Sequence, residues 1–200
     1  MEFLNIIREL VKEYDGNIIR RKNNTLLLGP GDMPRCRHML YAPLTKEYYD
    51  VHLIKQYKNK FPEEYLYLLE HVNGFELLKV RLLSQRVGFF ASSILIIFGL
   101  PVTPPYSRQP DMEEPFDIRV EDNLRRHPQT PVSWLKCGHF TKNYNFKVKY
   151  ALYIDTESGK VYSIIANAKK FKIEDEWESL DNCLCSIYNA YKDCEEEYNF

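Results

Sequence analysis

One pair of residues in this chain has the chemistry of a nucleophile and its base. Cys137 and His139 lie two positions apart in a strand-like segment. On a regular strand, residues two apart share one face of the sheet, and a thiol beside an imidazole can become a nucleophilic thiolate. A packed strand with a surface histidine is the competing interpretation, and the one we favour. A cysteine-dependent hydrolase is therefore an alternative, and we expect no catalytic residue.

Other candidate sites lack part of the pattern that they need. Cys183 and Cys185 would be about 200° apart on a helix, so their thiols could not hold one metal ion. Residues 155–159 resemble the opening of a calcium loop, but the glycine and glutamate required at its sixth and twelfth positions are absent. We expect no metal and no other cofactor.

Composition narrows the class of protein. The chain has 200 residues, of which 44% are hydrophobic, and this suits one domain with a sizeable core. Its 27 basic and 28 acidic residues give a net charge of -1, unlike the basic balance of a nucleic-acid-binding domain. Charge is uneven, however: residues 136–172 hold eight basic and two acidic residues, and residues 174–200 hold nine acidic and one basic. We expect no direct contact with nucleic acid.

The cysteines and the apolar runs indicate the cellular compartment of the protein. Five cysteines without regular spacing argue against a secreted disulfide framework. The first 14 residues are charged throughout and show no export signal. The most apolar run, residues 87–102, is about four residues short of a typical membrane span, so we expect a buried strand. A cytoplasmic protein without membrane contact is the prediction.

The elements that must position any site follow from hydrophobic periodicity and from turn residues. Apolar residues three and four apart predict the helices, and alternating apolar residues predict the strands. Helices are expected over residues 3–14, 45–57, 62–72, 116–126 and 177–191; two short strands are expected within 17–29, and further strands over 77–83, 87–100, 132–140, 148–154 and 161–165. This order predicts an α+β fold in one compact unit, with a mainly antiparallel sheet and helices packed beside it.

Several short motifs occur along the chain in a recognisable order. They are Phe61-Pro62-Glu63-Glu64-Tyr65, Leu68-Leu69, Asn73-Gly74, Phe98-Gly99-Leu100, Trp134-Leu135 with Gly138, an Asp155 to Gly159 hairpin, and a C-terminal helix from Ser179. The series resembles the SUKH superfamily, whose signature is Leu-Pro-x-x-Tyr, Leu-Leu, Asn-Gly and Tyr/Phe-Gly. Phe61 replaces the usual leucine. The signature residues Pro62, Tyr65, Asn73, Gly74, Gly99, Asp155 and Gly159 are expected to be structural.

The resemblance covers about residues 45–195, so the chain divides into a SUKH-like domain, 45–200, and an N-terminal helix and hairpin extension, 1–44. We expect the extension to dock on the same body. The superfamily includes a fungal cell-wall regulator and many bacterial immunity proteins, which are encoded beside secreted polymorphic toxins, often nucleases. The resemblance implies a cytoplasmic immunity protein that binds a toxin domain and needs no cofactor. A regulatory scaffold is the alternative within the superfamily.

An acidic surface is the expected contact for such a partner, because nucleases carry basic surfaces. The favoured acidic segment holds Asp111, Glu113, Glu114, Asp117, Glu121 and Asp122, with Tyr106 as an aromatic anchor. Its prolines limit the conformational freedom lost on binding. Residues 195–197 form a second acidic candidate, and simply solvated charge is the competing interpretation of both.

Overall fold

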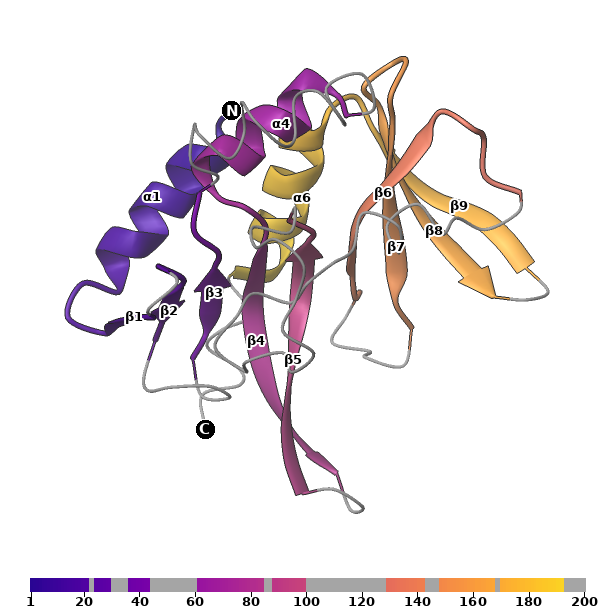
Figure 1. Cartoon of the computed structure of the whole chain (residues 1–200). Helices are drawn as coiled ribbons and strands as arrows, with labels where there is room; N and C mark the ends of the chain where they lie inside the picture. The colour runs from indigo at the N-terminus through magenta and orange to yellow at the C-terminus, as the bar shows by residue number, and fades with distance from the viewer. Residues whose placement is uncertain are drawn as a thin grey trace, which may run out of the picture.

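The computed structural model describes residues 1–21, 24–29, 36–43, 61–84, 88–99, 129–142, 148–167 and 170–192. Within them the chain forms three helices and nine strands (Figure 1). The helices are α1 (Phe3–Glu13), α4 (Glu63–His71) and α6 (Leu180–Lys192). The strands are β1 (Ile18–Arg20), β2 (Leu26–Leu28), β3 (His38–Leu40), β4 (Phe75–Ser84), β5 (Gly88–Ile97), β6 (Trp134–Phe140), β7 (Tyr150–Asp155), β8 (Val161–Asn167) and β9 (Lys170–Trp177). The helices expected over 45–57 and 116–126 lie outside the described residues.

The strands form one sheet in which every neighbouring pair is antiparallel and the spatial order follows the chain from β1 to β9. The three helices gather on one side of this sheet (Figure 1). The α+β class and the antiparallel sheet with helices beside it are therefore confirmed. The apolar run expected to form a buried strand contains β5.

Two strands were not expected from the sequence. β3 falls within residues 29–43, which the glycines and prolines had marked as a loop. β9 precedes the last helix, which begins at Leu180 and not at Trp177. β9 carries five charged side chains among its eight residues, as is common for strands at the edge of a sheet, and this composition concealed it.

The larger of two clusters of buried side chains in the described part of the chain joins α1 to α6. Phe3 of α1 packs against Phe75 of β4, with ring centroids 5.3 Å apart, and against Tyr188 of α6 at 6.3 Å. Leu28 of β2 and Leu40 of β3 belong to the same cluster of buried side chains. The N-terminal 44 residues therefore contribute a helix and three strands to the sheet and core of the rest of the chain.

Two carboxylates hold the N-termini of two helices. Glu64 of α4 accepts hydrogen bonds from the backbone N–H groups of Leu180 and Asp181, at 2.8 and 3.1 Å. The next N–H of α6, that of Asn182, donates to the Ser179 hydroxyl at 3.1 Å. Asp181 in turn accepts the N–H groups at the start of α1, those of Glu2 and Phe3, at 2.7 and 2.9 Å. Because the first N–H groups of a helix have no partner within it, this chain of caps connects α4, α6 and α1.

A contact between two glycines fixes where α4 meets the sheet. Gly74 has φ 85° and lies against Gly99, so that a Cβ on Gly74 would meet the Gly99 nitrogen at 2.6 Å. A Cβ on Gly99 would collide with the Asn73 carbonyl oxygen. The left-handed backbone of Gly74 follows an extended Val72, which is the C-cap residue of α4, so Gly74 does not itself cap the helix. Both glycines are therefore required by the close approach of two backbones.

We predict that Gly74→Ala costs much more stability than Gly159→Ala. Both residues have positive φ, but a Cβ at Gly159 would meet nothing within 4 Å. Gly159→Ala should therefore lose only about 1–2 kcal/mol of unfolding free energy, whereas Gly74→Ala should lose more than about 3 kcal/mol because its methyl group also meets backbone. Urea denaturation measures both losses, and equal values would contradict the described contact.

We also predict that Asp181→Ala lowers the unfolding free energy by about 1–2 kcal/mol, as the loss of a helix cap does. The substitution leaves the N–H groups of Glu2 and Phe3 without their acceptor. Glu178→Ala is the matched control, because it removes an exposed acidic side chain beside the same helix without removing a cap. If thermal melts of the two variants coincide, the cap does not carry this stability.

Candidate functional site on the open face of the sheet

One row of residues crosses the face of the sheet that points away from the described helices, which we call the open face. The strand register aligns Ile19, Leu27, Met39, Glu76, Ile96, His139, Ala151 and Ile164 from β1 to β8. Six of the eight are apolar, and at the β1–β3 end they join a second cluster of buried side chains that includes Cys36 and Tyr41. The row is therefore mostly apolar, and part of it is buried: Leu27, Met39 and Ile164 are 1%, 4% and 0% exposed. Two polar side chains, Glu76 and His139, lie near its centre.

Glu76 is the centre of a satisfied polar network. Its two carboxylate oxygens accept hydrogen bonds from the Tyr41 hydroxyl at 3.0 Å, the Ser93 hydroxyl at 2.9 Å and the Lys79 ammonium at 3.1 Å. The side chains of Lys79 and Glu76 are only 6% and 13% exposed. A buried ion pair whose remaining hydrogen-bonding positions are occupied adds rigidity. We interpret this network as a fixed support for the residues beside it.

A bulge in β6, two strands away from Glu76, separates the two residues that could have formed a catalytic pair. In the pairing of β6 with β7 the register shifts between Lys136 and Gly138, so Cys137 is an extra residue. Cys137 belongs to the core on the helix side, and its thiol donates to the Leu152 carbonyl at 3.6 Å. His139 lies in the row on the open face. The expectation that the two share one face is therefore wrong.

The surroundings of Cys137 and His139 fit this separation. Burial raises the pKa of the Cys137 thiol to about 12, so the thiolate needed for nucleophilic attack is scarce at neutral pH. The His139 ring packs edge-on against Phe98, with centroids 5.8 Å apart. The hydrolase alternative consequently has no assembled nucleophile and base among the described residues.

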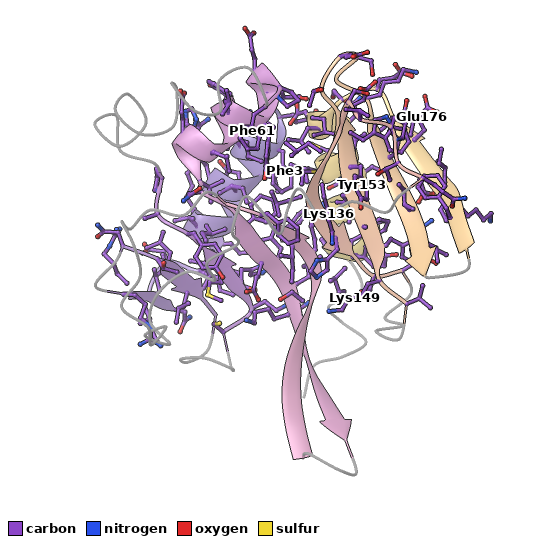
Figure 2. All side chains as sticks on the ribbon, turned by 45° about the vertical axis from the view of Figure 1, so that its right-hand side comes forward. Phe3, Phe61, Lys136, Lys149, Tyr153 and Glu176 are labelled. Carbon is purple, nitrogen blue, oxygen red and sulfur yellow. The ribbon has the colours of Figure 1, made fainter. Side chains whose placement is uncertain are left out.

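Three basic side chains lie together on the β6–β7 part of the open face. We call Lys136, His139 and Lys149 the basic strip (Figure 2 labels the two lysines). Burial lowers the pKa of Lys136, and the positive charge of Lys149 lowers it further. Burial also lowers the pKa of His139 to about 4, with Lys149 and Lys136 adding to the effect and Glu76 opposing it. His139 is therefore neutral at pH 7 beside two ammonium groups that repel each other.

Aromatic side chains border the basic strip. Trp134 stacks on Tyr162 with ring centroids 4.1 Å apart and an interplanar angle of 9°. Tyr153 of β7 lies 6.4 Å from Trp134. The Lys136 ammonium is 5.8 Å from the centroid of the Phe98 ring, within the range of a cation–π contact. Aromatic rings and cations together are a common composition of binding surfaces.

The two lysines of the strip differ from several other described lysines in having no acidic partner. Lys142 pairs with Asp175 at 2.6 Å, and Lys160 pairs with Glu176 at 2.7 Å. Within the described part of the chain, neither Lys136 nor Lys149 forms an ion pair. The strip can therefore bind an anionic group of another molecule. Across the same residues, no group of three or more His, Cys, Asp or Glu side chains could hold a metal ion.

The structure does not describe the acidic segment that the sequence favours as a contact surface. Tyr106, Asp111, Glu113, Glu114, Asp117, Glu121 and Asp122 all lie within residues 100–128, outside the described residues, and so does the acidic tail at 195–197. Their expected role stays a prediction. The basic strip was not expected as a site, although the excess of basic residues between 136 and 172 was the sequence signal for it.

The signature residues gather in two places. Pro62 immediately precedes α4, and Tyr65 within that helix donates its hydroxyl to the Phe98 carbonyl at 2.7 Å. Asn73, Gly74 and Gly99 meet at the same junction between α4 and the end of β5. This junction fixes the backbone of Phe98, whose ring contacts the basic strip.

The other two signature residues shape the turn between β7 and β8. The Asp155 carboxylate accepts the Ser158 hydroxyl at 2.6 Å and the Glu157 N–H at 3.3 Å. Gly159 has φ 76° and donates its N–H to the Asp155 carbonyl at 2.8 Å. The Asp155 side chain therefore stabilises the turn.

Comparison with known proteins identifies no family for this chain. The sequence matches no protein-family model, and no curated protein or solved structure is significantly similar to it. In the described part of the chain no helix has the length and apolar character required to cross a membrane.

We predict that Lys149→Ala raises the pKa of His139. Lys149 is exposed, so its removal should leave the fold intact, and removing a neighbouring positive charge favours protonation of the imidazole. NMR titration of the imidazole nitrogens between pH 3 and pH 7 measures the change. Lys12→Ala, which removes an exposed lysine of α1, is the control and should leave the pKa unchanged. An unchanged pKa in Lys149→Ala would show that the two groups do not interact.

Proposed function

We propose that this chain is a protein-binding module of the SUKH type that acts in the cytoplasm as an immunity protein, neutralising a toxin domain by direct binding. The observation that carries the proposal is the open face. It combines an apolar row, a stacked Trp134–Tyr162 pair, the Glu76 network and two lysines that have no acidic partner among the described residues. Such a surface suits contact with another macromolecule, because aromatic anchors on a rigid base lose little conformational freedom on binding.

The order of the SUKH-like motifs supports the family part of the proposal. Tyr65, Asn73 and Gly74 are separated from Gly99 by the strands β4 and β5, yet all four lie at one junction. Short motifs with a shared structural task are more informative than isolated matches, because each one constrains the others. The toxin part of the proposal rests on this resemblance.

The acidic segment from Asp111 to Asp122 is a proposed second contact for a basic partner. Reversing charge with Glu113→Lys and Glu114→Lys should slow association and weaken its dependence on salt, because steering acts through long-range charge. Association rates at two salt concentrations test this role. Unchanged rates in this variant and in one that lacks residues 195–197 would remove the acidic surfaces from the proposal.

We predict that co-expression of this chain protects a cell from the toxin domain encoded by the adjacent gene. The purified proteins should also form a stable complex, measured by isothermal titration calorimetry. A catalytically inactive toxin variant should bind equally well, because the proposed mechanism is direct binding. A neighbouring gene without a toxin domain, or a toxin that remains lethal and unbound, would contradict the proposal.

A further inference from the structure

We infer that the basic strip and the stacked Trp134–Tyr162 pair form the contact surface for an acidic segment of a partner protein. The inference rests on the proposed function, since it assigns the chemistry of the partner. It names carboxylate groups as the charges recognised by Lys136 and Lys149.

The first step is the uncompensated charge. Lys136 is half-buried on β6 without an ion pair in the part of the chain that the structure describes, and it is repelled by Lys149. Burying a cation without an acidic partner costs free energy, and a carboxylate brought to it recovers part of that cost. The strip therefore gains more from a bound anion than an exposed, paired lysine such as Lys172 would.

The second step is the order of residues in the row that runs from Lys136 across β7, β8 and β9. The register aligns Lys136, Tyr153, Tyr162 and Glu176 across β6, β7, β8 and β9. This row begins with a cation, continues through Tyr153, which is only 3% exposed, and the half-buried Tyr162, and ends with a carboxylate that is already paired with Lys160. A partner with one acidic end followed by apolar residues matches this order. Its acidic end would lie at β6, next to Lys149 as well.

The third step concerns the class of the partner, which could be a protein or a nucleic acid. Two ammonium groups neutralise about two phosphates, which is far fewer than the roughly six to ten contacts of a strong nucleic-acid binder. The acidic side chains Asp155 and Glu176 lie at the other end of the same face, where they would repel a continuous phosphate backbone. A short acidic segment of a protein can avoid them.

His139, which is neutral at pH 7, lies on the same surface, and its pKa serves as a readout of anion binding. His139 belongs to the row that also contains Glu76, its ring packs against Phe98, and its pKa responds to the charges of Lys136 and Lys149. A carboxylate bound to the two lysines offsets their repulsion of the imidazolium form. Binding should therefore raise the pKa of His139, and this readout is independent of the measured affinity.

The test uses the full chain and the peptide acetyl-Glu-Glu-Glu-Leu-Tyr-Leu-amide, observed by NMR. We expect shifts of the Trp134 indole and His139 imidazole signals, a raised His139 pKa, and binding that weakens with added salt. Lys136→Ala combined with Lys149→Ala should reduce affinity roughly tenfold or more, as for the loss of close charge pairs. Lys172→Ala is the matched control and should bind like the original chain. Lys149→Glu alone should also lose binding. Because Lys149 is exposed, this loss would come from the changed charge and not from misfolding.

Several results would overturn the inference. They are the absence of shifts at Trp134 and His139, equal binding of the peptide in which lysine replaces glutamate, equal binding by the double variant, or tighter binding of a twelve-residue oligothymidylate. The last result would make the strip a nucleic-acid surface.

Toxin binding by the original chain and by the double variant distinguishes a failure of this inference from a failure of the proposed function. If the double variant binds and neutralises the toxin as well as the original chain does, the strip is not the toxin contact: the inference fails and the proposed function stands. If the chain binds no toxin but the acidic peptide binds at the strip, the proposed function fails and the assignment of the strip to acidic segments stands.

Discussion

The carboxylates of Glu64 and Asp181 determine how the helices of this protein sit on the sheet. Glu64 accepts the first N–H groups of α6, and Asp181 accepts those of α1. A helix end buried without acceptors would be strongly unfavourable, so each of these helices depends on a side chain from another. The three helices therefore form one covering layer, against which Phe3, Phe75 and Tyr188 complete the core.

The opposite face of the sheet carries the proposed contact surface. Two backbone irregularities shape this face. The contact of Gly74 with Gly99 places the end of β5, and with it Phe98. The bulge in β6 turns Cys137 into the core and His139 toward the open face. Both irregularities act on the neighbours of Lys136, so the proposed binding surface and the core are connected through the same few backbone positions.

The sequence predicted those parts of the fold that depend on local patterns. The stripe of α1, the proline before α4 and the turn glycine Gly159 identified elements correctly because each acts within a few residues. β9 was missed because its charged side chains hide the alternation of an edge strand. The bulge at Cys137 could not be predicted, since it arises from pairing between β6 and β7 and reverses the face on which His139 lies. The basic strip was missed for a related reason: its cations are brought together by strand pairing.

The cap supplied by Asp181 also constrains the order in which the molecule can be completed during its synthesis. The first N–H groups of α1 leave the ribosome early, but their acceptor belongs to the last described helix. Until that helix emerges, α1 lacks its cap, and its apolar face lacks Tyr188. The helix α1 therefore lacks two hydrogen bonds and one aromatic contact until Asp181 and Tyr188 have been synthesised and α6 has formed.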